Sequence, residues 1–254
     1  MDLELRGKTA IVTGGSTGLG AGICEVLAYE GMNVIINYIF DQPQADAFAA
    51  DLSLKAGTKC VAYYGDISKA EDIDNIFNLA ETAYGHIDVL VNNAGIWPTT
   101  MIEDMPDEEW RKVVDINLNG TYLFCKRAVM HFLKHSVAGH IVNISSKSGF
   151  AVTSPGHAHY ATTKGALTLM IKSFAREFAA KGITINGVAP GMVRTPLNED
   201  KLSQKEWLDY YEKRIPVGRV ATAKEVAYAV AFLASEKAKN ITGTVIDVTG
   251  GMLI

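Results

Sequence analysis

Seven short runs rich in β-branched and apolar residues recur along the chain, each separated from the next by a longer segment with helical periodicity. The runs cover residues 8–13, 32–38, 60–65, 87–92, 139–145, 183–188 and 244–249. Strands that alternate with helices form parallel sheets, and strands that are apolar on both faces need helices on both faces. The sequence therefore predicts a doubly wound, three-layer α/β fold with a seven-stranded parallel sheet.

The organisation and charge of the chain narrow the range of functions. No linker-like break divides residues 1–254, which we expect to form a single domain. The net charge is −4 and no long basic run is present, so nucleic acid is not an expected partner. No apolar run reaches the roughly 18 to 20 residues of a membrane span. The first residues lack a signal-peptide layout, so we expect a cytoplasmic protein.

The three cysteines, Cys24, Cys60 and Cys125, are odd in number and lack CxxC spacing. They are therefore expected to be buried thiols and not disulfide or metal ligands.

A glycine-rich segment, TGGSTGLG, directly follows the first predicted strand and precedes a helix. Gly14, Gly18 and Gly20 would let an anion approach the free N–H groups at the helix N-terminus. This arrangement is typical of the pyrophosphate site of a Rossmann-type dinucleotide-binding domain. The alternative is a tight turn with no ligand.

Polar or glycine-containing turns also follow the third and fourth predicted strands. Asp66 lies in GDIS, and Asn93, Ala94 and Gly95 lie in NNAG. Ligands of open α/β sheets bind at the carboxyl ends of the strands, where these turns are expected. Each could instead be structural, and Asp66 could be a helix N-cap.

A tyrosine and a lysine, Tyr160 and Lys164, are four residues apart on a predicted helix and share one face of it. A nearby ammonium favours the phenolate, so the pair could perform acid–base chemistry. Ser146, at the end of the strand HIVNIS, could hold a substrate oxygen. Asn117 interrupts a helical run from about residue 107 to 135, and a solvent-facing side chain is its alternative interpretation.

These residues, in this order, resemble the short-chain dehydrogenase/reductase family from Gly14 to about Gly251. The resemblance rests on TGxxxGxG, NNAG, YxxxK and the PG at Pro190 and Gly191. It implies that Tyr160 is the catalytic acid/base and that Lys164 binds the ribose and lowers the pKa of the tyrosine. It further implies that Ser146 orients the substrate and that Asn117 holds a proton-relay water.

The resemblance also implies a nicotinamide dinucleotide, with Asp66 at the adenine and Val193 and Thr195 at the carboxamide. The residues expected to line the cofactor cleft are Gly14, Ser16, Thr17, Gly18, Leu19, Gly20, Asn37, Tyr38, Asp66, Ile67, Asn93, Ala94, Gly95, Tyr160, Lys164, Pro190, Gly191, Val193 and Thr195.

Local charge favours NAD over NADP. In such folds an acidic residue about 20 positions beyond the glycines binds the ribose diol of NAD, and a basic one accommodates the phosphate of NADP. Here the corresponding segment is NYIFD, which has Tyr38 and Ile39 where an acidic or a basic residue would be expected. No lysine or arginine occurs between Lys8 and Lys55. A hydroxyl, an amide or a base from another segment remains an alternative phosphate ligand.

Substrate specificity is expected from loops. The candidate contacts are Trp97, Ser148, Phe150, Val152, His157 and Trp207, with residues 195–214 as a substrate-loop segment. For Trp97 the alternative is core packing, and for Trp207 it is helix or subunit packing. His157 and His159 lack a third ligand, so no metal site is expected.

The motifs STGLG, INY and RTPLNEDK resemble the glucose 1-dehydrogenase branch of the family, which implies a sugar or polyol substrate and a homotetramer. Ile39 departs from that branch, where an arginine is expected. Ketones, steroids and 3-oxoacyl thioesters are the alternative substrates. A dinucleotide-sensing regulatory protein is the alternative from another functional class, and epimerisation or dehydration with internal use of NAD is a third reading.

Overall fold

The computed structural model describes residues 1–151 and 154–254. All seven predicted strands lie in one parallel sheet with the order β3-β2-β1-β4-β5-β6-β9. The strands are β1 (Thr9–Val12), β2 (Asn33–Tyr38), β3 (Cys60–Tyr64), β4 (Val89–Asn92), β5 (His140–Ile144), β6 (Thr184–Pro190) and β9 (Val245–Val248). The doubly wound, Rossmann-type α/β fold is therefore confirmed.

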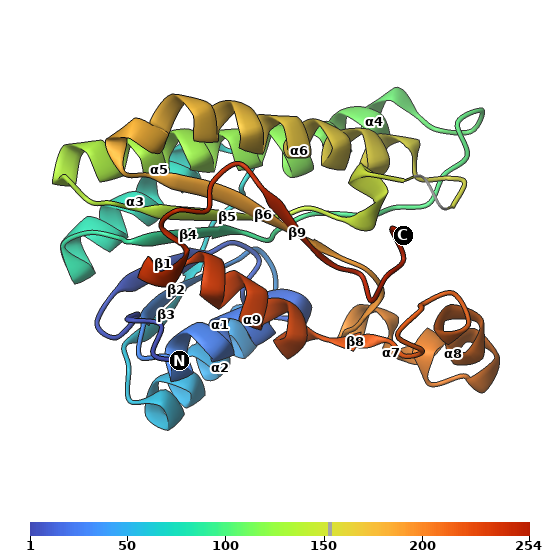
Figure 1. Cartoon of the computed structure of the whole chain (residues 1–254), viewed down its shortest axis with the longest axis horizontal. Helices are drawn as coiled ribbons and strands as arrows, with labels where there is room; N and C mark the ends of the chain where they lie inside the picture. The colour runs from blue at the N-terminus through green and yellow to red at the C-terminus, as the bar shows by residue number, and fades with distance from the viewer. Residues whose placement is uncertain (152–153) are drawn as a thin grey trace.

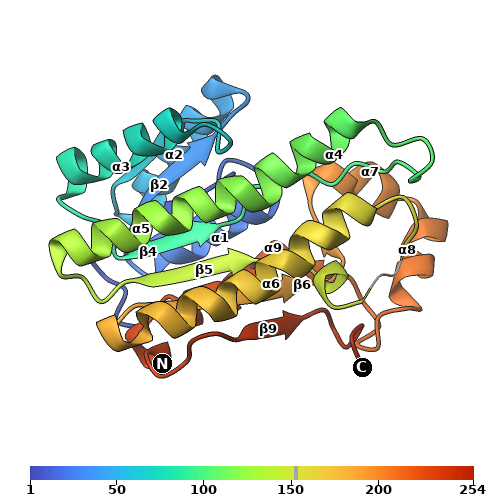
Figure 2. The same ribbon diagram turned by 90° about the horizontal axis from the view of Figure 1, so that it is seen from above.

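Helices cover both faces of this sheet, as Figures 1 and 2 show. One layer holds α1 (Gly18–Tyr29), α2 (Gln42–Ala56) and α9 (Ala223–Leu233). The other holds α3 (Ala70–Tyr84), α4 (Asp107–Val114), α5 (Thr121–His135) and α6 (Ala158–Phe178). Two short helices, α7 (Glu199–Leu202) and α8 (Lys205–Glu212), lie beyond the carboxyl ends of the strands.

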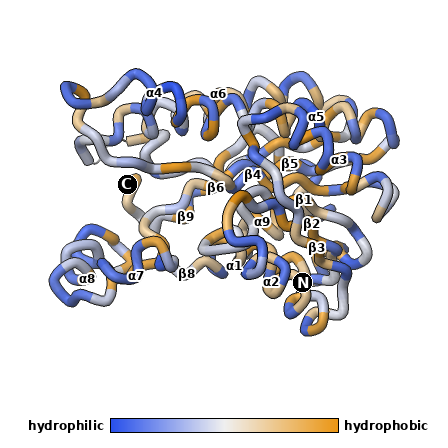
Figure 3. Tube along the Cα trace, turned by 180° about the vertical axis from the view of Figure 1, so that it is seen from behind, coloured by the Kyte–Doolittle hydropathy of each residue, from blue (hydrophilic) through white to orange (hydrophobic). Residues whose placement is uncertain are grey.

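The hydrophobic core forms two layers, one on each side of the sheet. Along β1 the side chains of Ala10 and Val12 enter one core cluster, and that of Ile11 enters the other. All three are fully buried, which is the physical reason that the strands read as continuous apolar runs. In Figure 3 hydrophilic and hydrophobic colours alternate along α5 and α6, as expected for helices with one face on the sheet.

The strand order places a topological switch point between β1 and β4. The chain leaves β1 toward β2 and β3 on one side, and continues from β4 toward β9 on the other. Loops that leave β1 and β4 therefore diverge, and they open a crevice at the carboxyl ends of the strands where ligands bind.

Three local features differ from the sequence-based expectations. The helical run from Asp107 to His135 contains a π-helical stretch at Asp115–Gly120, between α4 and α5. A separate two-stranded ladder pairs β7 (Val193–Arg194) with β8 (Ala221–Thr222). All three cysteines are free thiols, but only Cys24 and Cys125 are buried, because Cys60 begins β3 near the sheet edge.

Among residues 1–151 and 154–254, no helix is both long enough and apolar enough to cross a membrane.

Candidate active site

The glycine segment forms a turn that leads directly into the N-terminus of α1. Gly14 and Gly18 have φ values of 58° and 56°, in the left-handed region that favours glycine. Thr17, the N-cap, makes no side-chain cap hydrogen bond, and the first turn of α1 contains no acidic residue. Thr17 is exposed and Ser16 and Leu19 are half-buried beside it. The helix start therefore offers backbone donors and a favourable dipole to an anion.

Close packing beneath this turn explains the third glycine. A Cβ on Gly20 would overlap the carbonyl oxygen of Gly14 and approach Nδ2 of Asn93 to 2.7 Å. The turn thus packs against Asn93 at the end of β4, and Asn37 accepts the N–H groups of Gly14 and Gly15. The N–H groups of the first turn of α1 lack partners within the helix, as a site for a dinucleotide pyrophosphate requires. These residues fit a nicotinamide dinucleotide.

The NNAG segment holds the glycine turn in place. Asn93 Nδ2 donates to the carbonyls of Thr13 and Gly14, both at 3.0 Å. The backbone N–H groups of Asn93 and Ala94 both donate to Thr13 Oγ1, at 2.9 and 3.0 Å. Asn93 and Ala94 therefore tie the ends of β1 and β4 together at the switch point.

Lys164 and Tyr160 project from α6 toward the end of β5. Lys164 is 5% exposed, and its Nζ donates to the carbonyl of Ile144 at 2.7 Å. The same Nζ lies 5.7 Å from the centroid of the Tyr160 ring. Ser146 follows β5 and accepts a hydrogen bond from the N–H of Ser148 at 3.1 Å. The structure thus brings Ser146, Tyr160 and Lys164 together.

Burial has the largest effect on the pKa values of Tyr160 and Lys164. It raises the pKa of Tyr160, and a hydrogen bond with Ser146 opposes that shift. Burial also lowers the pKa of Lys164 to about 8. The net direction at Tyr160 is opposite to the lowering expected from Lys164, because the effect of burial outweighs that of the hydrogen bond with Ser146.

Asn117 is buried and not solvent-facing. Its Oδ1 accepts the N–H of Ile96 and its Nδ2 donates to the carbonyl of Ile96, both at 2.9 Å. A Cβ on Gly95 would meet Asn117 Oδ1 at 3.2 Å and Lys164 Nζ at 4.0 Å, so the three residues converge. The side chain of Asn117 therefore shapes the segment after NNAG, and its water-holding role stays a prediction.

The residues expected at the adenosine end lie around the ends of β2 and β3. Asn37 is buried, and its Nδ2 donates to the carbonyl of Gly65 at 2.9 Å. Tyr38 is 5% exposed and meets Tyr64 edge-on. Asp66 is not a helix N-cap, because α3 is capped at Lys69; it instead accepts the N–H and hydroxyl of Ser68, at 2.9 and 2.7 Å. Ile67, next in the chain, is buried.

The segment after β6 closes the other side of the crevice. Pro190 ends β6, and a Cβ on Gly191 would meet Thr249 Cα at 2.9 Å. Val193 is buried in β7. The side chain of Thr195 lies 3.6 Å from the position of a Cβ on Gly18. The segment that follows the PG pair therefore approaches the glycine turn through Thr195.

Two of the proposed substrate contacts, Trp97 and His157, lie next to Tyr160. Trp97 is 47% exposed, and its ring centroid is 4.8 Å from that of His157 and 6.2 Å from that of Tyr160. His157 Nδ1 bonds to the carbonyl of Pro98 at 2.9 Å. Because a carbonyl only accepts, Nδ1 carries the proton and the neutral ring leaves Nε2 as an acceptor.

The other substrate candidates have different settings. Phe150 is half-exposed just after the turn that contains Ser148. Trp207 belongs to an aromatic cluster on α8, with Tyr210 at 5.7 Å and Lys201 Nζ 4.0 Å from its ring, which favours helix packing. The predicted substrate-loop segment forms α7 and α8. Val152 lies outside the described residues.

Sequence reasoning did not assign two hydrogen-bond partners of the Tyr160 backbone, Thr163 and His159, or the residue that bonds to His159 in turn, Glu109. Thr163 Oγ1 donates to the Tyr160 carbonyl at 2.8 Å, and the Tyr160 N–H donates to His159 Nδ1 at 2.8 Å. His159 Nε2 in turn lies 3.1 Å from Glu109 Oε1. A hydroxyl residue beside the lysine and a histidine beside the tyrosine were visible signals, but Glu109 is 50 residues away in the sequence.

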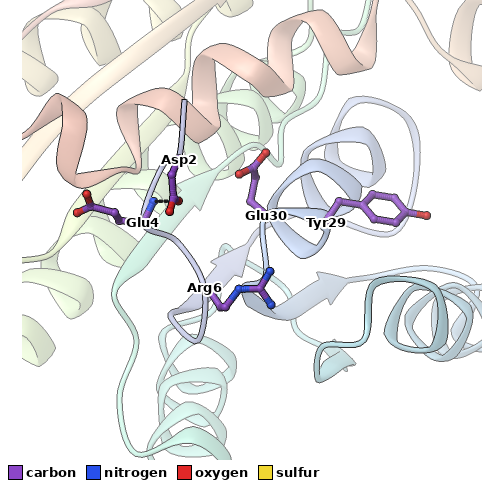
Figure 4. A pocket seen from close by; sticks show the side chains of 5 residues that line it. All are labelled: Asp2, Glu4, Arg6, Tyr29 and Glu30. Carbon is purple, nitrogen blue, oxygen red and sulfur yellow. Dashed lines mark hydrogen bonds between the residues drawn. The ribbon is translucent and has the colours of Figure 1, made fainter.

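Two other features, a surface hollow and a cluster of titratable side chains, lie away from the candidate site. A surface hollow, drawn in Figure 4, is lined by Asp2, Glu4, Arg6, Tyr29 and Glu30 near the N-terminus.

The second group comprises Glu81, His131 and His135, whose potential ligand atoms lie within 4.8 Å of one another. His131 Nε2 accepts the N–H of Ile87 at 3.0 Å, so Nδ1 carries the ring proton and offers no lone pair to a cation.

Comparisons with known proteins agree with this geometry. A sequence profile described as enoyl-(acyl carrier protein) reductase matches residues 14–253. The chain is 39% identical over 251 residues to 3beta-hydroxysteroid dehydrogenase 1 of Eggerthella lenta, covering 99% of this chain and 95% of that protein. It is 38% identical over 252 residues to glucose 1-dehydrogenase 2 of Bacillus subtilis, covering 99% and 96%.

A solved structure has the same fold. It is a variant of a Serratia marcescens short-chain dehydrogenase/reductase, with a TM-score of 0.91 and 32% identity over 98% of this chain and 99% of that one. The chain belongs to the short-chain dehydrogenase/reductase family, and it is an NAD(P)-dependent oxidoreductase that acts on alcohol or carbonyl groups.

Proposed function

We propose that this enzyme uses NAD to oxidise a ring-bearing secondary alcohol, or to reduce the corresponding ketone. The observation that carries the proposal is the half-exposed indole of Trp97 beside the Tyr160 ring, with centroids 6.2 Å apart. A saturated ring that lay on the indole would bury its apolar face and present its CH–OH carbon toward Tyr160. The names of the Eggerthella and Bacillus relatives denote ring-bearing substrates, a steroid and a sugar, which supports this class.

In this proposal the protein supplies proton transfer and orientation. The bound nicotinamide supplies or accepts the hydride. Tyr160 gives its hydroxyl proton to the carbonyl oxygen during reduction and takes it back during oxidation. Ser146 accepts the N–H of Ser148 and its hydroxyl bonds to Tyr160, so a substrate oxygen bound between the two hydroxyls would take over the bond that they make with each other. Lys164, with a pKa of about 8, is mainly an ammonium at neutral pH, and it stabilises the phenolate as that forms.

The charge around the expected adenosine end supports NAD over NADP. A hollow there is lined by Tyr38, Gln42, Asp46, Ala62, Tyr63, Tyr64, Asp72 and Asn75. Among these described lining residues two are carboxylates and none is basic. A 2′-phosphate dianion would meet repulsion at this end of the crevice, whereas an uncharged ribose diol would not.

We also propose the homotetramer that is usual in the family. Four exposed apolar side chains lie on α5 and α6, at Tyr122, Met130, Leu133 and Leu169. Tyr122 contacts Phe174 of α6 edge-on at 6.2 Å, so the two helices present one surface. Burial of this surface against a second copy supports the assembly, and light scattering on the purified protein tests it.

The function is tested by fluorescence titration with NADH and NADPH, followed by turnover assays on the same sample. The substrate panel contains sugars, polyols, 3-hydroxysteroids, 3-oxoacyl thioesters and an enoyl thioester. We expect tighter binding of NADH and turnover of at least one ring-bearing alcohol or ketone. Tyr160→Phe should keep the NADH Kd within a few-fold and lower kcat by about 10²-fold or more, whereas Tyr29→Phe, a change on the exposed end of α1, should be neutral.

Three results would contradict parts of this proposal. NADH binding without turnover of any substrate would favour a dinucleotide-sensing protein. Turnover of the thioesters alone would remove the ring-bearing class. Unchanged kcat in Tyr160→Phe would remove the assigned proton donor.

A further inference from the structure

The first turn of α6, which carries Tyr160, has an unusual hydrogen-bond arrangement. The first N–H groups of a helix lack partners within the helix, and a side chain at the N-cap commonly accepts one of them. His157, the N-cap of α6, makes no such bond. Instead, the N–H of Tyr160 donates to Nδ1 of the adjacent His159 at 2.8 Å. The ring of His159 therefore acts as the cap, and it does so at the residue that bears the phenol.

This contact determines the tautomer of His159. A nitrogen that accepts an N–H bond carries no proton, so the neutral ring carries its proton on Nε2. Nε2 lies 3.1 Å from Glu109 Oε1, and the carboxylate can only accept. Glu109 therefore favours the one tautomer that can receive the Tyr160 N–H. A carboxylate that fixes a histidine tautomer in this way also fixes the ring orientation.

The pair connects two helices through a buried side chain. His159 is fully buried, and Glu109 lies in the first turn of α4 with its side chain 28% exposed. The Tyr160 carbonyl is held as well, by Thr163 Oγ1 at 2.8 Å. Both backbone polar groups of Tyr160 thus have partners beyond the regular helix ladder. A displacement of about 1 Å at a reacting group can cost about 10²-fold in rate, so this backbone anchoring matters for catalysis.

We propose that His159 is a positioning residue for the acid/base tyrosine and that Glu109 acts through it by setting its tautomer. The inference rests on the assignment of Tyr160 in the proposed function. His159 does not touch the reacting atoms, and its effect passes through the backbone of Tyr160 and the first turn of α6.

Two amide substitutions separate the two contacts of the ring. His159→Asn keeps an acceptor at the position of Nδ1 but cannot reach Glu109. His159→Gln keeps a donor that reaches toward Glu109 but removes the acceptor next to the Tyr160 N–H. Glu109→Leu removes the partner that sets the tautomer. Glu108→Gln, an exposed carboxylate in the same turn of α4, is the matched control.

For His159→Gln we expect kcat to fall by about 10- to 100-fold while the NADH Kd stays within about threefold of the wild-type value. The primary isotope effect on kcat with 4-deuterated NADH should rise, because the chemical steps become slower relative to product release. Hydrogen exchange at the first turn of α6 should become faster. His159→Asn should recover most of kcat, Glu109→Leu should fall between the two, and Glu108→Gln should match the wild type.

Each other outcome overturns a specific part of the argument. Wild-type kcat in His159→Gln, with Tyr160→Phe inactive, removes the role of His159 and leaves the proposed function intact. Parallel losses of kcat, NADH affinity and thermal midpoint in both His159 variants make the residue merely structural. An active Tyr160→Phe variant overturns the proposed function itself, independently of the His159 variants.

Discussion

The ammonium of Lys164 donates a 2.7 Å hydrogen bond to the backbone carbonyl of Ile144, and the lysine is only 5% exposed. This bond joins α6 to the end of β5, and it holds a positive charge at the place where Ser146 leaves the sheet. Burial opposes the charge and lowers the pKa of Lys164 to about 8.

The buried ammonium makes a prediction about stability. The native pKa of about 8 is below the ordinary value of 10.5, so between these pH values the unfolded chain binds a proton that the native protein does not. Native stability should therefore rise with pH across this window, by at most about 3 kcal/mol. In Lys164→Met this contribution is absent. Denaturant titrations of both proteins at pH 7.5, 8.5 and 9.5 should give a free-energy difference that shifts toward the wild type as the pH rises, and parallel values would contradict the prediction.

The close contact between Gly20 and Gly14 makes a prediction about the glycine turn. Gly20→Ala would push the added methyl group against the Gly14 carbonyl and Asn93 Nδ2. We expect it to lower the thermal midpoint and to weaken NADH binding by at least about tenfold, because the turn must move. Gly165→Ala is the control, since the nearest atom to its Cβ is Gly149 O at 3.8 Å. In the interior of α6 this control should gain about 0.5–1 kcal/mol. Equal NADH affinities in the two variants would show that the turn does not bind the cofactor.

The absence of lysine and arginine between Lys8 and Lys55 in the sequence makes a prediction about cofactor choice. Ile39 follows β2 directly and is 40% exposed. Ile39→Arg would place a guanidinium where a 2′-phosphate is expected, and it should lower the Kd for NADPH by about tenfold with little change for NADH. Ile39→Gln provides the uncharged control. If both variants leave NADPH binding unchanged, the ribose does not lie at this end of the sheet.

The buried histidine His131, near Glu81 and His135, makes a prediction about how the stability of the fold depends on pH in the acid range. Burial and the neighbouring His135 lower the pKa of His131 to about 4. The native protein therefore keeps His131 neutral between about pH 6.5 and 4, while the unfolded chain protonates it. Stability should fall through this window as the pH falls, by at most about 3 kcal/mol from this residue. His131→Gln keeps an acceptor for the Ile87 N–H and should show a flatter dependence of thermal midpoint on pH. An unchanged slope would locate the acid sensitivity elsewhere.

The fold was predictable because its signals are local and repeated. Each of the seven strands was expected from its own apolar run, and each was found within two residues of the expected ends. The β7–β8 ladder was not expected, because each of its strands has only two residues and pairs with a segment 28 positions away, as Val193 does with Ala221. Such short strands have no periodicity of their own and are formed by the packing around them.

The candidate site shows the same division between local and distant information. The residue types and spacings, together with the resemblance to the short-chain dehydrogenase/reductase family, predicted that Gly14, Ser146, Tyr160 and Lys164 would belong to one site, since strand ends and helical faces follow from local pattern. The tertiary structure decided what each side chain bonds to: Asn117 to Ile96, Lys164 to Ile144, and His159 to Glu109. It also decided the direction of the pKa shift of Tyr160, which burial raises. These outcomes depend on contacts between residues far apart in the chain and on exclusion of water, and both arise only once the layers have packed.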